Sequence, residues 1–143
     1  MRLKSIDRRP ACRKSAHVTR IRRRFFKEER VLIDHRTYTV RPGTTPAQIE
    51  LYSKLGYPVQ LRYMGEPHYY MMAESGELNT LVHGWIYESA ADREAKRKSM
   101  AQDPEWKHYL AENAKAGNVV QQRNVLMVPV GFAPKISPAR IVK

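Results

Sequence analysis

Three ring side chains at alternate positions carry the clearest chemical signal in this sequence. His83, Trp85 and Tyr87 are each separated by one residue, and alternate side chains of a β-strand project from the same face. An imidazole changes its charge near neutral pH and can act as a general acid or base. We therefore expect His83 to be a candidate acid/base and Trp85 and Tyr87 to be ligand-binding residues, or else all three rings to pack in a core.

A second alternating stretch supplies polar partners for these rings. Within residues 32–40, the side chains of Asp34, Arg36 and Tyr38 share one face of a predicted strand. A guanidinium that leaves water is costly unless it meets a carboxylate or an anionic ligand. Two alternatives follow. Arg36 forms an ion pair with Asp34, or Arg36 anchors an anionic ligand, with Tyr38 as a candidate hydrogen-bond donor.

The sequence contains no local pattern for a metal or a cofactor. The histidines at positions 35, 68, 83 and 108 are scattered, and the glycines at positions 43, 56, 65 and 76 are isolated turn residues rather than a phosphate-binding loop. We therefore predict no metal and no cofactor. The lone Cys12 excludes an intramolecular disulfide and fits a reducing compartment, so we expect a cytoplasmic protein.

Positive charge is concentrated at the N-terminus. Of the formal net charge of +12, residues 1–30 contribute twelve Lys and Arg against three Asp and Glu. This segment can bury little surface, so we expect a disordered extension. Three origins stay open: a basic arm that contacts nucleic-acid phosphates, a mitochondrial presequence, or a start site assigned too far upstream. The third is possible because the codons of residues 27–29 can spell a ribosome-binding sequence just before Val31 or Leu32.

The remainder of the chain is close to neutral. Residues 31–143 carry fourteen Lys and Arg against eleven Asp and Glu. We therefore predict no specific nucleic-acid binding, because such binding depends on a basic surface. No apolar run approaches the ~20 residues that a membrane-spanning helix needs, so we also predict no membrane span.

The order of the predicted elements indicates an α+β fold. Ser89 with Asp92 forms a capping box, and Asp103 with Pro104 restarts the next helix. Residues 56–58 are expected to interrupt the first helix, and a turn at residues 75–77 joins two strands into a hairpin. Strands are predicted at 32–40, 67–74, 78–87 and 119–129, with helices after the first and the third. This β-α-β-β-α-β order predicts a ferredoxin-like four-stranded antiparallel sheet.

The third predicted strand is apolar on both faces. His83 and its neighbours occupy one face, whereas Val82, Gly84 and Ile86 occupy the other. Two helices can cover only one face of the sheet, and a soluble monomer rarely exposes a large apolar patch. We therefore expect a homodimer in which two sheets pack face to face around a cavity, with the predicted site residues lining that cavity.

The motifs of the chain resemble those of the NIPSNAP family. They are Arg36-Thr-Tyr38 with Pro42-Gly43, Glu74-x-Gly-x-Leu-Asn79, His83-x-Trp-x-Tyr87 with Ser89 and Asp92-Arg-Glu94, and Asp103-Pro-Glu-Trp106. The resemblance covers about residues 32–130 and implies the dimeric α/β-barrel superfamily, whose members include small monooxygenases. It divides the chain into an extension at 1–30, a NIPSNAP-like domain at 31–131 and a tail at 132–143.

These expectations leave two functions open. In the first, the dimer barrel binds a small, partly apolar or anionic molecule, and any reaction is a cofactor-independent oxygenation or an isomerase-like proton transfer. His83 would then be the acid/base, Arg36 the anion anchor and Tyr38 the donor. In the second, the barrel interior is packed, and the protein is a non-enzymatic interaction or scaffold protein. The resemblance fixes the fold and leaves the activity undetermined.

Overall fold

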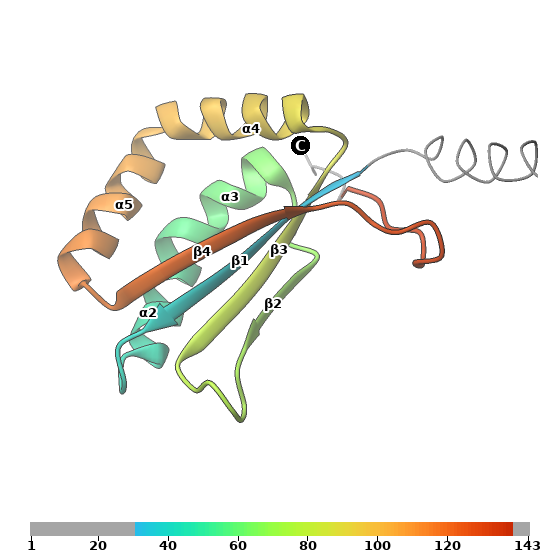
Figure 1. Ribbon diagram of the computed structural model, residues 1–143. Helices are drawn as coiled ribbons and strands as arrows, with labels where there is room; N and C mark the ends of the chain where they lie inside the picture. Colours follow the sequence, from blue (N-terminus) through green and yellow to red (C-terminus); the bar gives the residue numbers. More distant parts are fainter. Residues whose placement is uncertain (1–30, 139–143) are drawn as a thin grey trace, which may run out of the picture.

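The computed structural model describes residues 31–138 and contains one antiparallel sheet with helices. The strands are β1 (Leu32–Val40), β2 (Tyr69–Met72), β3 (Thr80–Tyr87) and β4 (Val119–Met127), and they lie side by side in the order β2-β3-β1-β4 (Figure 1). The helices are α2 (Thr45–Leu51), α3 (Tyr57–Met64), α4 (Ala90–Gln102) and α5 (Pro104–Ala116). The predicted β-α-β-β-α-β order is confirmed, and the sheet is open rather than closed on itself.

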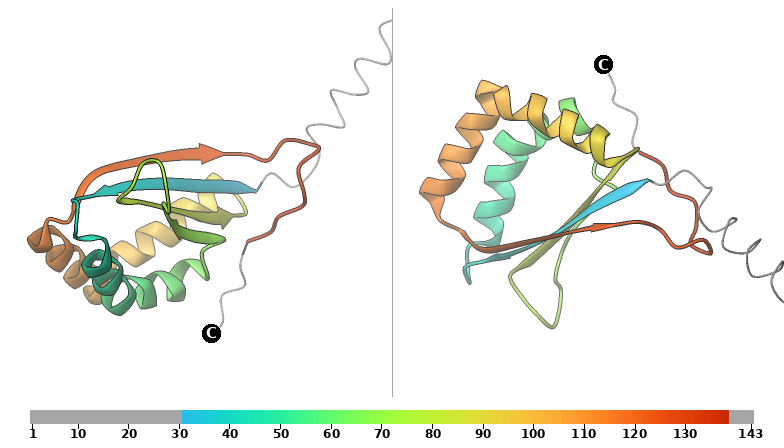
Figure 2. Two further views of the ribbon diagram at one scale, coloured as in Figure 1. Left: turned by 90° about the horizontal axis from the view of Figure 1, so that it is seen from below. Right: turned by 45° about the horizontal axis from the view of Figure 1, so that its top comes forward.

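All the helices lie on one face of the sheet (Figure 2). The core forms where α3 and α4 meet β3, and it consists of Val59, Met64, Trp85, Tyr87 and Met100. The opposite face of the sheet has no helix over it, and we call it the open face. Edge strand β4 lies largely outside this core, because all its residues after Val119 are exposed.

The predicted helix starts are confirmed in atomic detail. Ser89 Oγ accepts a hydrogen bond from the Asp92 amide at 3.1 Å, which caps α4. Asp103 Oδ1 accepts from the Glu105 amide at 2.8 Å and caps α5, whose first residue is Pro104. The other oxygen of Asp103 accepts hydrogen bonds from two side chains at the end of α3, Arg62 and Tyr63. One carboxylate therefore fixes the corner between α4 and α5 against α3.

The expected break at residues 56–58 is wrong. A π-helical turn, Tyr52–Gly56, joins α2 directly to α3, so the backbone stays helical throughout. Pro58 has no amide proton to continue the helical hydrogen bonds, and it directly follows the π-helical turn, where the Tyr57 amide bonds to the Tyr52 carbonyl five residues back. Gly56 allows close packing, because a Cβ there would come within 2.8 Å of the Tyr52 ring and 3.0 Å of the Tyr109 ring.

The hairpin between β2 and β3 is confirmed, with shorter strands than predicted. Its connection runs through residues 73–79 and includes two residues with positive φ, Gly76 at 77° and Asn79 at 62°. The predicted extension at residues 1–30 and the last five residues of the predicted tail lie outside the described residues.

Candidate functional site

The five predicted site residues share one face of the sheet, but it is the helix-covered face. Arg36 pairs with His83 across β1 and β3, and Asp34 pairs with Trp85. The side chains were predicted to face a cavity between two sheets, but they lie on the face that the helices cover (Figure 2), where Trp85 and Tyr87 pack against α3 and α4. The residues concerned are Arg36, Tyr38, His83, Trp85 and Tyr87.

Two of these residues belong to the core. Trp85 and Tyr87 are each 1% exposed and pack with Met64 and Met100. The Tyr87 hydroxyl donates a hydrogen bond to the Met64 sulfur at 2.9 Å. Burial raises the pKa of Tyr87 to about 12, so its phenol is neutral at physiological pH. The ligand-binding roles of Trp85 and Tyr87 stay predictions.

His83 is enclosed by aromatic rings and is 2% exposed. Tyr70 stacks on it with ring centroids 4.7 Å apart, and Tyr38 meets it edge-on at 4.9 Å. Nδ1 accepts a hydrogen bond from the Trp85 indole at 3.3 Å, whereas Nε2 has no partner among residues 31–138. Burial, with the nearby charge of Arg36, lowers the pKa of His83 to about 4. The imidazole is therefore neutral at pH 7, with its proton on Nε2, and its acid/base role stays a prediction.

The predicted ion pair between Arg36 and Asp34 is confirmed. Arg36 donates to both oxygens of the Asp34 carboxylate, at 3.2 and 3.1 Å, and a further nitrogen donates to the Tyr38 hydroxyl at 3.1 Å. Asp34 is fully buried and also accepts from Arg93 of α4 at 2.8 Å. Burial alone would raise the pKa of Asp34, but the bonds and charges of Arg36 and Arg93 hold it below its usual value.

The contact between Arg93 and Asp34 was not predicted, because the two residues lie 59 positions apart in the sequence. Asp92 and Lys96 of α4 have the spacing of an ion pair on a solvent-exposed helix face, which conceals the inward-facing arginines. The signal that could have found this contact is the spacing of Arg93 and Arg97. Residues four apart share one face of a helix, and here that face is turned toward the sheet.

A second polar network, which was not predicted either, lies on the open face. The register places Tyr69 beside Gly84 on β3, and Gly84 beside His35 on β1. The ring of Tyr69 lies over Gly84, and its hydroxyl is 2.6 Å from His35 Nδ1. The other His35 nitrogen is 3.4 Å from the Thr37 hydroxyl. A glycine inside a strand can mark the close approach of a neighbouring side chain. Gly84 is therefore the residue from which this contact could have been predicted.

Apolar side chains surround this network on the open face. Met71 is 55% exposed, Val125 44% and Met127 38%. Val82 and Ile33 are partly buried, and all five lie in strand positions that alternate with the helix-facing ones. The open face therefore has a polar centre bordered by apolar side chains, and the exposed Arg123, which pairs with Thr37, lies on the same face.

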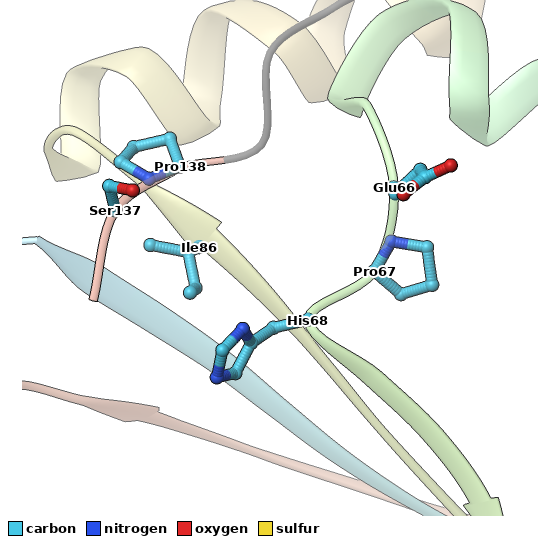
Figure 3. A pocket seen from close by; sticks show the side chains of 6 residues that line it. All are labelled: Glu66, Pro67, His68, Ile86, Ser137 and Pro138. Carbon is cyan, nitrogen blue, oxygen red and sulfur yellow. The ribbon is translucent and has the colours of Figure 1, made fainter.

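A cavity of about 330 Å³ lies beside Ile86 of β3. Figure 3 shows Ile86 between the 66–68 segment that precedes β2 and Ser137 and Pro138 of the tail. The tail thus folds back to the sheet at this point. None of the five predicted site residues lines this cavity.

Within residues 31–138, no three His, Cys, Asp or Glu side chains are grouped so that they could hold a metal ion. Among the helices of the same residues, none combines the length and the apolar character that crossing a membrane requires.

Comparison with solved structures finds close relatives of this fold. An uncharacterized NIPSNAP-like domain protein from Burkholderia xenovorans superposes with a TM-score of 0.71 and 26% identity, over 79% of this chain and 97% of that chain. A NIPSNAP family protein with unknown function from Agrobacterium tumefaciens superposes with a TM-score of 0.70 and 27% identity, over 77% and 97%. Comparison with curated proteins finds no match.

A more distant structure shares the fold alone. It is a protein from Nitrosomonas europaea described as a candidate antibiotic biosynthesis monooxygenase, with 9% identity, a TM-score of 0.54 and coverage of 76% of this chain and 99% of that chain. The model of the NIPSNAP family matches residues 33–134, which include nearly all of the sheet and every helix described above. This chain belongs to the NIPSNAP family.

Proposed function

We propose that this protein forms a homodimer through the open face of its sheet and binds a small, partly apolar molecule between the two sheets. One observation carries the proposal, namely the hydrogen-bonded network of Tyr69, His35 and Thr37 among apolar side chains of the open face. The activity of the family is undetermined, so the proposal is a binding function and assigns no reaction.

The proposed dimer is inferred from the apolar side chains that are exposed on the open face. Met71, Val125 and Met127 are all more than a third exposed on a face that no helix covers. A patch of this kind on a soluble protein marks an interaction site. A second copy related by a two-fold axis presents the same patch, so the apolar side chains of one copy would pack against those of the other.

The ligand follows from the polar centre. Side chains that only pack two sheets together would be apolar, because burying hydroxyl and imidazole groups is costly unless each keeps its hydrogen bonds. In the 2.6 Å contact between the Tyr69 hydroxyl and His35 Nδ1, either group can be the donor, depending on the histidine tautomer. These groups suit a small molecule with one hydrogen-bonding group and an apolar remainder.

The dimer is tested with Val125→Glu in the full chain. Val125 lies on the open face and is 44% exposed, so a glutamate there should leave the fold intact and place a charge in the proposed interface. Leu110→Glu is the matched control, because Leu110 is 46% exposed on α5. Light scattering after gel filtration should give a dimer for the wild type and Leu110→Glu and a monomer for Val125→Glu. A monomeric wild type would overturn the proposal.

Ligand binding is tested by thermal shift with a library of small phenols and carboxylic acids. At least one compound should raise the melting temperature of the wild type. The same compound should raise that of Tyr69→Phe clearly less, because this variant loses only the hydroxyl. Equal shifts for the two proteins, or no shift with any compound, would contradict a ligand at this network.

A scaffold function is the second candidate, and the packed helix-facing core favours it. Trp85 and Tyr87 fill that side of the sheet. A dimer without any ligand response would support this candidate. In either case, the cytoplasm remains our proposed compartment, and the catalytic roles of His83 and Tyr38 and the ligand roles of Arg36, Trp85 and Tyr87 remain predictions on the helix-facing side.

A further inference from the structure

The helix-facing side of the sheet carries more positive charge than it neutralises. Asp34 is fully buried and is bonded by Arg36 of β1 and Arg93 of α4. Two guanidinium groups therefore share one carboxylate. Asn124 of β4 lies 3.5 Å from the same carboxylate but carries no charge.

Arg97 adds a third guanidinium to this group. It follows Arg93 by one helical turn, so both side chains extend from the same face of α4. Arg97 is half-buried, and within residues 31–138 no carboxylate lies within 4 Å of its guanidinium. Burial, followed by the charges of Arg36 and Arg93, lowers the pKa of Arg97. Three positive charges against one negative charge leave the cluster with a net charge of +2.

Neighbouring acidic residues do not remove this excess. Of the two acids in the first turns of α4, Asp92 pairs with Lys96 at 2.9 Å and accepts from the Glu88 amide. The other, Glu94, is exposed and forms no ion pair with Arg93 or Arg97 within residues 31–138. The side chains of Arg36 and Arg93 are only 14% and 20% exposed, so water screens them incompletely. Partly buried like charges repel one another and favour binding of an anion.

The cluster is open to solvent on the side of β4. Asn124 pairs with Arg36, and Leu126 pairs with Asp34, in the register of β1 and β4. Both β4 side chains lie on the helix-facing side and are exposed, Leu126 by 47%. A ligand can therefore approach the arginines past β4 and place an apolar part against Leu126.

We propose that Arg36, Arg93 and Arg97 form a binding site for a phosphate monoester group between the helix-facing side of β1 and helix α4. A phosphate monoester carries a charge of about −1.5 to −2 at pH 7, which matches the excess of the cluster. Arg97 can bind phosphate oxygens through two parallel hydrogen bonds, whereas Arg36 and Arg93, whose paired nitrogens already bond Asp34, contribute mainly their positive charge. The site lies on the other side of the sheet from the proposed dimer interface and does not depend on it.

The probe for the test is inorganic phosphate, measured by isothermal titration calorimetry on the full chain with ionic strength held constant by sodium chloride. Arg97→Gln removes one guanidinium of the cluster. Lys98→Gln is the matched control, because it removes one positive charge from an exposed side chain one residue further along α4. The basic residues 1–30 are present in every variant, so their contribution is the same throughout.

Wild type and Lys98→Gln should bind phosphate with similar affinity, and Arg97→Gln should bind it at least about tenfold more weakly. Without phosphate, Arg97→Gln should melt at the same or a higher temperature than the wild type, because the variant removes repulsion. If Arg97 only stabilised the fold, Arg97→Gln would instead melt at a lower temperature than the wild type. Equal phosphate affinities for Arg97→Gln and Lys98→Gln would overturn the site. Tighter binding of succinate than of phosphate would overturn the phosphate assignment.

Discussion

The phenol ring of Tyr69 lies in the space that any side chain at Gly84 would need. A Cβ placed on Gly84 would be 2.5 Å from Cε1 of Tyr69, which is far closer than packed carbon atoms approach. The ring crosses β3 at this point and delivers its hydroxyl from β2 to His35 on β1. Gly84 therefore determines whether the polar centre of the open face can form.

Gly84→Ala should destabilise the protein by about 1–3 kcal/mol, because the added methyl displaces the Tyr69 ring. Urea unfolding measures this cost. A double-mutant cycle supplies the control: in the Tyr69→Ala background the ring is gone, so Gly84→Ala should cost much less. Equal costs in both backgrounds would show that the ring is not the reason for the glycine.

The stability of the protein should depend on pH through His83. The pKa of His83 is about 4 in the folded protein against an ordinary value of 6.5. Between these values the unfolded chain binds more protons, so the free energy of unfolding should rise from pH 4 to 6.5, by at most about 1.4 kcal/mol per pH unit, and then level off.

Urea unfolding from pH 4.5 to 7.5 measures this dependence. His83→Gln should show a clearly smaller slope below pH 6.5, because it has no ionisable ring. His108→Gln, at an exposed position of α5, should keep the slope of the wild type. If His83→Gln keeps the wild-type slope, His83 is not the group that titrates.

Asp34→Asn should destabilise the protein by about 3–5 kcal/mol, because it leaves partly buried guanidinium groups without their carboxylate. Chemical unfolding at pH 7 measures the loss. Glu50→Gln is the control, since it breaks a solvent-exposed pair with Lys54 and should have a much smaller effect. Similar losses in both variants would mean that the buried pair contributes no more than an exposed one.

Tyr52→Phe should cost about 1–3 kcal/mol. The Tyr52 hydroxyl donates to Gln60 Oε1 at 2.6 Å, and both side chains are buried, so its removal leaves an unpaired acceptor. Tyr57→Phe tests the same chemical change at a partly buried position whose hydroxyl makes no hydrogen bond within residues 31–138. Its free energy of unfolding should stay close to that of the wild type.

Local signals explain which parts of the fold could be predicted. The bounds of β1 and the caps at Ser89 and Asp103 depend on residues close together in the chain. The side of the sheet that the helices cover is not a local property. Period-two alternation in β3 separates His83 from Val82 but does not say which one faces α4, and both faces of this strand are apolar.

The two polar networks could not be predicted for a related reason. Arg93 reaches Asp34 across 59 positions, and Tyr69 reaches His35 across 34. Both contacts depend on strand order and register, which the hairpin pattern alone does not determine. The pair of Arg36 and Asp34 was predictable because the two residues lie on one strand, two positions apart.

Helix α4 is held at both ends. Near its start, Arg93 is bonded to the carboxylate of Asp34. After its last turn, Asp103 is bonded to Arg62 and Tyr63 of α3. The helix that carries Arg97 is therefore already ordered before any anion arrives. Binding of an anion at Arg97 would therefore carry no entropic cost for ordering the backbone of α4, and only the arginine side chain would lose conformational freedom.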